Sequence, residues 1–327
     1  MNNFLELKNL VIGYRKPLSK PINLSVGEYG LTGLLGINGI GKTTLLKTIA
    51  NLVKPFEGEV LFRGKKLSEY SIKVLARYIT YTNNIMFRAG MLVSDFLELA
   101  FLPYSSFPEK LRDKKIAYIA EKFEIVDLLS KRMEQLSDGQ RQLINIARIL
   151  LQDTEIVLLD EPFNFLDIKN IFFVLGILKE FSLKGKFIIF STHQLRIALQ
   201  YSDFVWVIKD GELLYGVPEQ MALNNVFDNL FHTNNIIFSH KEMDFQINQN
   251  HKQYKIQLIF GKDHKRNMWT ERFLYRKGFQ IVSDAEVSVK IDKEYWFLQT
   301  KKETFTFKDL GGLSRKLNEL YNISNNC

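Results

Sequence analysis

The chain has 327 residues, of which 46% are hydrophobic, a composition that excludes a disordered chain and allows one large domain with a smaller second one. No apolar run approaches the roughly 20 residues that cross a bilayer, and the start, MNNFLELKNL, lacks the pattern of a secretory signal, so we expect a cytoplasmic protein. The single cysteine, Cys327, excludes a disulfide framework and a thiol metal cluster.

The formal net charge of +8 is unevenly distributed along the chain. From Thr233 onward there are 16 Lys and Arg against 11 Asp and Glu. A basic balance is compatible with nucleic acid or an anionic membrane surface as a partner. The charges of this segment are mixed in sign and carry no basic motif interleaved with aromatic residues, so we expect an ordinary solvated surface and no nucleic acid.

The first predicted site is a phosphate loop within GLLGINGIGKTT, which lies between the apolar strand GLTGLLG and the helix-forming TLLKTIANL. Its glycines let backbone N–H groups converge on phosphates at the positive end of the helix. Lys42 can reach the β and γ phosphates, and the Thr43 hydroxyl can bind Mg²⁺. The candidate nucleotide-binding residues of this loop are Gly36, Asn38, Gly39, Gly41, Lys42, Thr43 and Thr44.

A second predicted anion site begins the helix in QLSDGQRQLINIARILL, residues 135–151. Ser137 stands at the N-cap, and Leu143, Ile146, Ala147 and Leu150 recur on one face. A capped core helix explains part of this pattern. The alternative is a second anion site formed by the Ser137 hydroxyl and the first N–H groups, with no phosphate nearby in the same chain to fill it.

A pair of acids follows the apolar run EIVLL, which we interpret as a buried parallel strand. Such a strand delivers Asp160 and Glu161 to its carboxyl end, where ligands bind in open α/β sheets. Asp160 is a candidate Mg²⁺ residue, and Glu161 is the candidate that polarises the attacking water.

The sequence LSDGQ resembles the signature motif of ATP-binding cassette (ABC) proteins. The resemblance covers about the first 230 residues and implies an ABC-type P-loop NTPase domain of the α/β class with a helical subdomain. It implies that Ser137, Gly139 and Gln140 of one copy contact ATP held by the phosphate loop of a second copy. The expected assembly is a head-to-tail dimer that closes on two ATP molecules.

Other motifs of this family occur in the expected order. By resemblance, Tyr14 stacks on adenine, Asp167 in NFLD belongs to a loop that crosses the dimer interface, and His193 in FIIFSTH contacts the γ-phosphate. Where the family carries a glutamine that binds Mg²⁺, alignment of LARYITYTNN places Asn84, with Asn83 as the alternative. Glu161, His193 and Lys42 are the expected catalytic residues, and Thr43, Asp160 and Asn84 are the expected Mg²⁺ residues.

Asp138 departs from the family pattern because glycine is usual at the third signature position. A carboxylate at an anion site is compatible with ATP binding only if it points away from the phosphate.

Segment 75–104 indicates the partner, because in the family it forms the groove that receives a helix of the membrane subunit. Its apolar residues are equally compatible with a place in the core. GMLVSDFLELAFLPY resembles the segment of importers for iron-siderophore, haem and cobalamin complexes through Gly90, Val93, Leu97, Pro103 and Tyr104, and it differs from them at Ala100 and Phe101. We therefore expect permease subunits as direct partners, and an external binding protein as an indirect one.

We divide the chain into an ABC domain at 1–232, with the helical subdomain at about 85–150, and a small α/β domain at 233–327. The sequence of the second domain predicts a strand, a helix, three strands and a final helix, and it contains no cluster of candidate catalytic residues.

The resulting hypothesis is an ATP-hydrolysing subunit of a bacterial importer, peripheral on the cytoplasmic face of the inner membrane, with ATP and Mg²⁺ as cofactors. The alternatives are an ABC exporter subunit and a non-transport ABC switch that acts with nucleic acid.

Overall fold

The computed structural model describes residues 3–82, 90–104, 106–228, 230, 236–240, 242–247 and 254–321. The chain divides into two compact units, Met1–Gln246 and Ile247–Cys327.

A six-stranded sheet in the order β10-β9-β3-β8-β7-β6 forms the centre of the first unit. Its strands are β3 (Gly30–Leu35), β6 (Ile79–Thr82), β7 (Ile156–Leu159), β8 (Phe187–Ser191), β9 (Phe204–Lys209) and β10 (Glu212–Gly216). Strands β3, β6, β7, β8 and β9 run parallel to one another, and β10 pairs antiparallel with β9. The carboxyl ends of the parallel strands therefore share one edge.

The central strands β3, β7 and β8 are buried on both faces, which explains why they are nearly continuous apolar runs. In β7, Ile156 and Leu158 belong to one core, whereas Val157 and Leu159 belong to another. The same alternation divides β8. A parallel strand with apolar residues on both faces needs a layer on each side, and the first unit supplies two.

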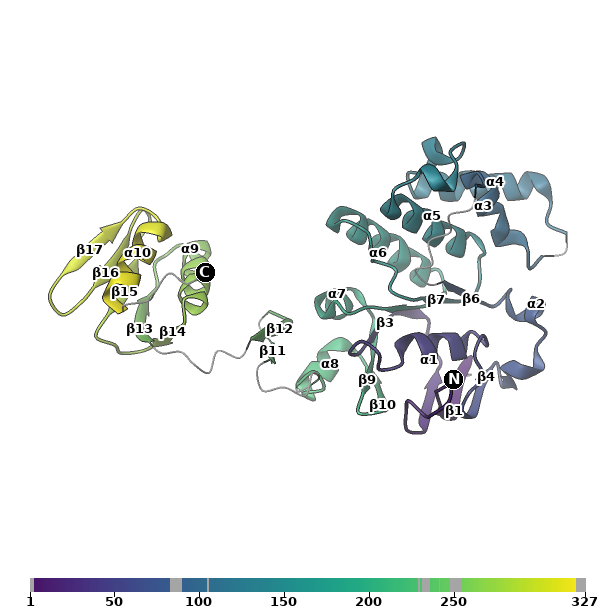
Figure 1. Ribbon diagram of the computed structural model, residues 1–327, viewed down its shortest axis with the longest axis horizontal. Helices are drawn as coiled ribbons and strands as arrows, with labels where there is room; N and C mark the ends of the chain where they lie inside the picture. Colours follow the sequence, from purple (N-terminus) through teal and green to yellow (C-terminus); the bar gives the residue numbers. More distant parts are fainter. Residues whose placement is uncertain are drawn as a thin grey trace. The chain divides into compact units, whose positions relative to one another are not determined.

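One layer is an antiparallel sheet in the order β2-β1-β4-β5, with helix α1 (Lys42–Ile49). Its strands are β1 (Leu5–Val11), β2 (Ile22–Val26), β4 (Glu57–Phe62) and β5 (Lys65–Lys66). Figure 1 shows α1 between this sheet and the six-stranded one, where its buried Leu45, Leu46 and Ile49 join the core.

The other layer is helical. The core there includes residues of α3 (Val93–Glu98), α4 (Glu109–Lys122), α5 (Asp138–Leu151) and α6 (Ile168–Leu183). Shorter helices are α2 (Ile72–Leu75), α7 (Leu195–Tyr201) and α8 (Pro218–Leu223), with 3-10 turns at Leu67–Glu69, Leu99–Phe101, Val126–Leu128 and Met133–Gln135.

A two-stranded sheet of β11 (Ile236–Ser239) and β12 (Asp244–Ile247) ends the first unit. Phe238 lies 5.2 Å from Phe227 between ring centroids, and Phe238 and Phe245 join the core around α7 and β9. These contacts explain why the structural division falls after Gln246. The domain boundary between 232 and 233 remains a prediction.

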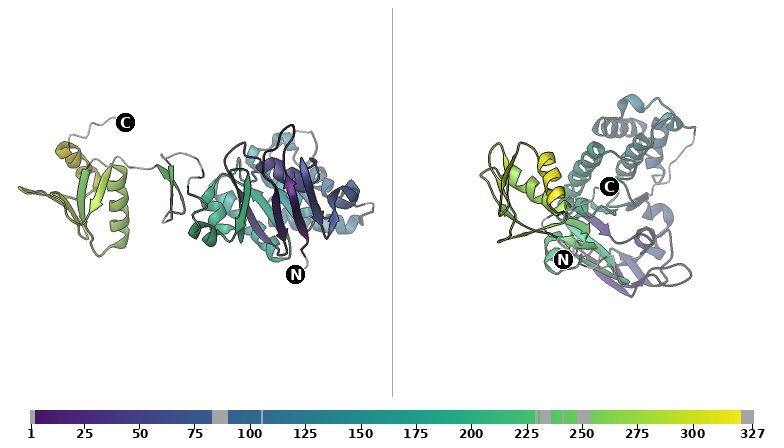
Figure 2. Two further views of the ribbon diagram at one scale, coloured as in Figure 1. Left: turned by 90° about the horizontal axis from the view of Figure 1, so that it is seen from below. Right: turned by 60° about the vertical axis from the view of Figure 1, so that its left-hand side comes forward.

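The second unit is a five-stranded sheet in the order β14-β13-β15-β16-β17, seen from two further directions in Figure 2. Its elements are β13 (Tyr254–Ile259), α9 (His264–Arg276), β14 (Phe279–Val282), β15 (Ser288–Ile291), β16 (Trp296–Gln299), β17 (Thr304–Phe307) and α10 (Leu310–Tyr321). Side chains of α9 and α10 share one core with the strands, including Phe273, Leu274, Leu313 and Leu317.

The prediction of three strands after the helix is wrong, because YWFLQTKKETFTF forms an antiparallel hairpin of β16 and β17. Its turn is closed by the Thr300 N–H, which donates to the Glu303 carbonyl over 2.9 Å. The Thr300 hydroxyl also accepts from the Glu303 N–H over 3.0 Å. Local hydrogen bonds of one threonine thus reverse the chain without glycine or proline.

Among the described residues, the structure contains no helix with the length and apolarity needed to span a bilayer.

Candidate functional site

The phosphate loop joins the end of β3 to α1 and adopts a conformation that requires glycine. The φ angles of Gly36, Gly39 and Gly41 are 151°, 79° and 116°, all positive. No side chain caps α1, and no acidic residue lies in its first turn. Uncapped N–H groups at a positive helix end favour an anion, so the loop geometry fits a phosphate group.

Lys42 lies within this loop and is 7% exposed. Its ammonium donates to the carbonyls of Gly36 over 2.7 Å and Ile37 over 3.3 Å. Burial lowers the pKa of Lys42, whereas the carboxylates of Glu161 and Asp160 act in the opposite direction. The loop thus holds a poorly hydrated cation that an anionic ligand would stabilise further.

Asp160 and Glu161 follow β7 at the shared edge, as the sequence predicts. The Asp160 carboxylate accepts from the Ser191 hydroxyl over 2.6 Å and from the Tyr81 hydroxyl over 3.3 Å. The Ser191 oxygen accepts the Glu161 N–H over 2.8 Å. Ser191, which ends β8 and is fully buried, therefore positions both acids at once.

Sequence reasoning missed Ser191 and Tyr81. Burial, followed by the nearby Asp160 carboxylate, raises the pKa of Tyr81, so its hydroxyl stays protonated as a donor. The available signal was position, since both residues lie at or next to the carboxyl ends of strands adjacent to β7.

His193 lies two residues beyond β8, and its Nδ1 is 3.2 Å from Glu161 Oε2. Glu161 has a φ of 52°, which is uncommon for a residue with a side chain and places its carboxylate beside the imidazole. A cavity of about 110 Å³ lies between the phosphate loop and His193, lined by Gly36, Asn38 and Thr192 among others. Predicted catalytic residues from three parts of the sequence thus meet at one edge.

The predicted second anion site begins α5. The Ser137 hydroxyl accepts the Gln140 N–H over 3.2 Å, and the Gln140 side chain accepts the Ser137 N–H over 3.0 Å. This reciprocal capping box fixes the first turn. A Cβ on Gly139 would lie 3.0 Å from the Phe165 carbonyl, so glycine lets this turn approach the loop before α6 closely.

The Asp138 carboxylate accepts a hydrogen bond from the guanidinium of Arg141, one turn later on α5. Arg141 also donates to the carbonyls of Leu136 and Met133 and is 9% exposed. Asp138 is therefore directed toward a fixed cation. The contact compensates the negative charge of this carboxylate within its own helix.

The remaining candidates are Tyr14 and Asp167, which the structure describes, and Asn84, which it does not. Tyr14 is 60% exposed in the turn after β1, which leaves its ring available for stacking. Asp167 is the N-cap of α6 and accepts the Asn170 N–H over 2.8 Å, so it has a structural role of its own. Asn83 and Asn84 lie outside the residues that the structure describes.

The donors at the edge fit Mg²⁺, which prefers hard oxygen ligands and needs few protein groups when phosphates complete its shell. They are the Thr43 hydroxyl, at the start of α1, and the buried Asp160 carboxylate. Within the described ranges, no group of three or more His, Cys, Asp or Glu side chains could hold a metal ion by itself.

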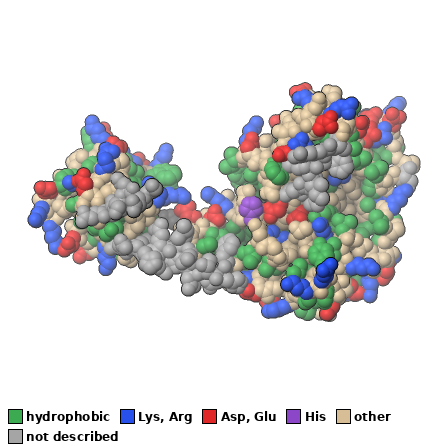
Figure 3. Space-filling model, in the orientation of Figure 1, with side chains coloured by type: hydrophobic (Ala, Val, Ile, Leu, Met, Phe, Trp, Pro, Cys, Tyr) green, Lys and Arg blue, Asp and Glu red, His purple; other side chains and the backbone are tan. Residues whose placement is uncertain are grey.

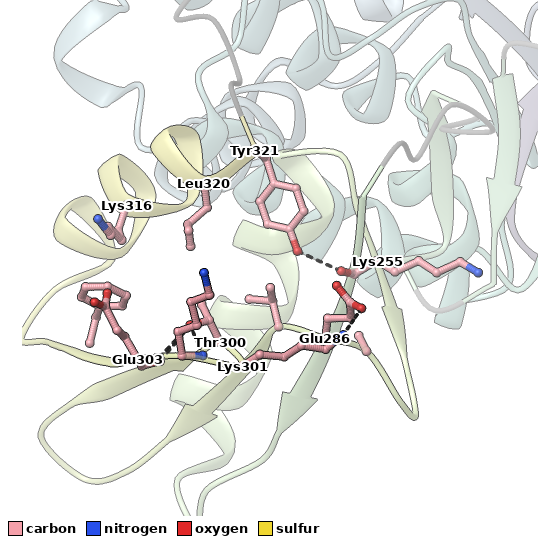
Figure 4. A pocket seen from close by; sticks show the side chains of 12 residues that line it. Lys255, Glu286, Thr300, Lys301, Glu303, Lys316, Leu320 and Tyr321 are labelled. Atoms are coloured by element: carbon pink, nitrogen blue, oxygen red, sulfur yellow. Dashed lines mark hydrogen bonds and ion pairs between the residues drawn. The ribbon is translucent and has the colours of Figure 1, made fainter.

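The second unit contains an open cavity of about 720 Å³ next to α10, shown in Figure 4. Lys301 pairs with Glu286 at its rim, and the side chain of Lys255 points away from it. The ammonium of Lys316 lies 4.6 Å from the ring centroid of Phe305, which lines the cavity. On the face drawn in Figure 3, acidic and basic side chains are interspersed over both units.

Comparisons with known proteins agree with this geometry. Residues 19–164 match the ABC transporter family, and residues 255–318 match the iron ABC transporter C-terminal domain. An uncharacterized ABC transporter ATP-binding protein of Methanocaldococcus jannaschii is 33% identical over 288 residues, covering 85% of this chain and 98% of that protein.

Two further relatives carry functional names. A vitamin B12 import ATP-binding protein of Yersinia pseudotuberculosis is 31% identical, covering 76% of this chain and 96% of its own length. A petrobactin import ATP-binding protein of Bacillus subtilis is 29% identical, with coverages of 69% and 92%.

Among solved structures, cbiO1 of Clostridium perfringens, part of the ABC transporter complex cbiONQ, has a TM-score of 0.61 at 28% identity, covering 69% of this chain and 92% of that one. A dimeric ATP-binding cassette bound to ADP and phosphate has a TM-score of 0.59 at 26% identity, with coverages of 65% and 98%.

Proposed function

Because the chain belongs to the ABC transporter family, as a transport-coupled ATP hydrolase with an ABC-type fold, we propose that it is the ATPase subunit of an importer. The observation that carries the proposal is the single sheet edge that brings together the phosphate loop, Glu161 and His193. The second unit supports it further, because its match is to an iron transporter domain.

Each side chain at the edge has a proposed part in the reaction. Glu161 accepts the proton of the attacking water, and His193 holds the Glu161 carboxylate and contacts the γ-phosphate. Lys42 exchanges its loop carbonyls for phosphate oxygens. Bound ATP supplies the phosphate to be transferred. Thr43 and Asp160 would hold Mg²⁺, which would compensate the charge of the phosphates.

A second copy of the chain completes each site in this proposal. Ser137 and Gly139 of that copy face the γ-phosphate, and Gln140 fixes the turn that carries them. The dimeric solved relative supports this arrangement. ATP binding closes the dimer, and hydrolysis allows it to open, which gives the permease its power stroke.

The proposed place of the protein is the cytoplasmic face of the cell membrane, where it binds two permease subunits. Ile72, three residues before the segment that the sequence assigns to the permease groove, is 86% exposed, and Leu102, within that segment, is 72% exposed. Exposed apolar side chains in that region favour a protein partner. An external binding protein would deliver the cargo to the permease.

The proposed cargo is an iron-siderophore, haem or cobalamin-type complex. The names of the petrobactin and vitamin B12 import relatives support this class, and the iron transporter domain supports an iron complex within it.

The experiment is affinity purification of the tagged chain from detergent extracts, followed by uptake of labelled iron chelates, haem and cobalamin. We expect two permease subunits in the purified complex, and uptake that Glu161→Gln abolishes. Export of the cargo, or recovery with RNA or DNA that salt disrupts, would replace the importer with one of the alternatives.

A further inference from the structure

Helix α9 begins with a well-defined cap and has a clear inward face. The Asp263 carboxylate accepts the N–H groups of Lys265 and Arg266 over 2.9 and 3.2 Å. Asn267, Thr270, Phe273 and Leu274 are buried on its inner side, where both apolar residues join the core of the second unit. The rotation of this 13-residue helix is therefore fixed.

The opposite side of α9 consists of Lys265, Met268, Trp269, Arg272 and Arg276, which we call the basic aromatic face. Their spacing of one, three or four residues places them together, away from the buried side. All five are exposed, and none is acidic. The half-buried Glu271 lies toward the flank of this face.

Large apolar side chains are exposed on this face, in contrast to the other tryptophans of the chain. Trp269 is 49% exposed and Met268 is 48% exposed, whereas Trp206 and Trp296 are 3% and 8% exposed. The guanidinium of Arg272 lies 5.7 Å from the Trp269 ring centroid, so the cation and the aromatic ring are neighbours on the same exposed face.

The neighbouring loop exposes a further apolar residue. Phe260 is 56% exposed and directly precedes Gly261. The Asn267 side chain binds both the N–H and the carbonyl of Gly261, over 2.9 and 2.8 Å. These bonds hold the loop against the side of α9 that carries the buried Asn267, so the basic aromatic face is defined without the exposed Phe260 ring.

We propose that the basic aromatic face binds the surface of an anionic lipid bilayer. Lys and Arg are attracted to anionic headgroups, while Trp and Met side chains enter the boundary between headgroups and acyl chains. Charge complementarity selects this occupant, because the face carries three cations, no carboxylate and apolar side chains between them. The contact is peripheral and adds to whatever a permease provides.

This inference depends on the proposed function only for the presence of the protein at a membrane. A lipid-binding test that uses neither permease nor transport therefore separates the two proposals. A failed uptake assay would not affect the lipid-binding result, and absent lipid binding would not affect the proposed import function.

The test mixes the full-length purified chain with vesicles of phosphatidylcholine alone, or of an equimolar mixture with phosphatidylglycerol, and measures co-sedimentation and tryptophan emission. Because Trp206 and Trp296 are buried, Trp269 is the tryptophan whose emission a surface contact changes. We expect binding to the anionic vesicles, weakening with salt, with a blue shift that Trp269→Phe removes.

The face variant is Lys265→Gln, Arg272→Gln and Arg276→Gln together. It should bind anionic vesicles at least about tenfold more weakly, because each Lys or Arg near such a surface contributes separately. The matched control, Lys290→Gln, Lys302→Gln and Lys308→Gln, removes the same charge from exposed positions of the same unit outside the face. It should retain most of the affinity, and circular dichroism verifies that both variants fold.

Three outcomes would overturn the proposal. One is equal or absent binding to the two kinds of vesicle. Another is an equal loss of affinity in the face variant and the control. The third is release of the chain from the vesicles by RNA, if RNA binding requires the same three cations. The basic aromatic face would then be a nucleic-acid-binding surface.

Discussion

At the residue scale, the chemistry depends on how two neighbouring acids are kept different. Asp160 is buried and bound by the hydroxyls of Ser191 and Tyr81, whereas Glu161 turns toward His193. The first arrangement suits a charge that stays fixed, and the second suits a carboxylate that exchanges a proton with water. The same short sequence thus provides two environments through one residue with positive φ.

The role of Glu161 predicts a specific kinetic effect. Glu161→Gln should lower the turnover of ATP by roughly 10²- to 10⁴-fold, the usual contribution of a general base, and leave ATP affinity nearly unchanged. Steady-state hydrolysis and equilibrium nucleotide binding measure the two quantities. Glu212→Gln, which removes a carboxylate from an exposed ion pair with Lys20, is the control and should hydrolyse ATP normally. A normal turnover in Glu161→Gln would remove Glu161 from the mechanism.

The Asp138–Arg141 pair predicts rescue in a double-mutant cycle. Arg141→Ala should weaken ATP-driven dimerisation, because it leaves a carboxylate uncompensated beside the partner's phosphates. Asp138→Gly added to it should restore much of the loss, with a coupling free energy of about 1 kcal/mol or more. Dimerisation constants of the four proteins are the measurement. A purely structural role for Arg141, through the Leu136 and Met133 carbonyls, predicts no rescue.

The sequence revealed those residues whose type and spacing are unusual, such as the glycines and Lys42. Ser191 and Tyr81 are common residue types, and their part in the site depends on strand neighbours that are distant in the sequence. The orientation of Asp138 was equally inaccessible, because it depends on a side-chain rotamer. Its partner Arg141 lies three residues later, so a salt bridge within α5 was a detectable alternative.

At the element scale, long apolar runs were predicted well and local turns were not. The fold class is confirmed, and β3, β7 and β8 coincide with predicted buried strands. The hairpin of β16 and β17 was missed because Lys301 and Lys302 look like the exposed positions of one long strand. The β11–β12 pair was missed because its segment is polar, and only Phe238 and Phe245 anchor it to the core.

The junction between α5 and β7 predicts a dependence of stability on pH. Partial burial alone would raise the pKa of Asp153, but hydrogen bonds from Lys186 and Lys115 lower it below the ordinary value. A carboxyl group with a depressed folded-state pKa stabilises the fold above its unfolded pKa of about 3.9, and this contribution is lost as pH falls through the lower folded value.

Asp153→Asn should therefore lower the urea midpoint of unfolding at pH 7, and its difference from the unmodified chain should shrink below about pH 4. Asp127→Asn is the control, since Asp127 is exposed and forms no ion pair within the part of the chain that the structure describes. If the urea midpoint of Asp153→Asn lies below that of the unmodified chain by the same amount down to the lowest measurable pH, the lysine contacts of Asp153 do not stabilise the fold.

At the scale of the whole molecule, the two units have different evidence of function. The first carries every described residue of the proposed catalytic site, and the second carries a sheet, two helices and the basic aromatic face. The relative from Methanocaldococcus jannaschii matches 85% of this chain, so its similarity extends beyond the ATPase unit. Motifs with fixed spacing identified the first unit from the sequence. The sequence of the second unit shows no such motif, and its family was identified by comparison.

The central claim is that each active site takes its phosphate loop from one copy and its signature turn from another. The direct measurement is the ATPase rate of an equal mixture of Lys42→Ala and Ser137→Ala chains, assayed with the permease or at concentrations that allow pairing. Each variant alone should be nearly inactive. Random pairing restores one intact site in half of the dimers, so the mixture should recover up to about a quarter of the normal rate. A mixture no more active than its two components, or full activity of Ser137→Ala alone, would contradict the shared site.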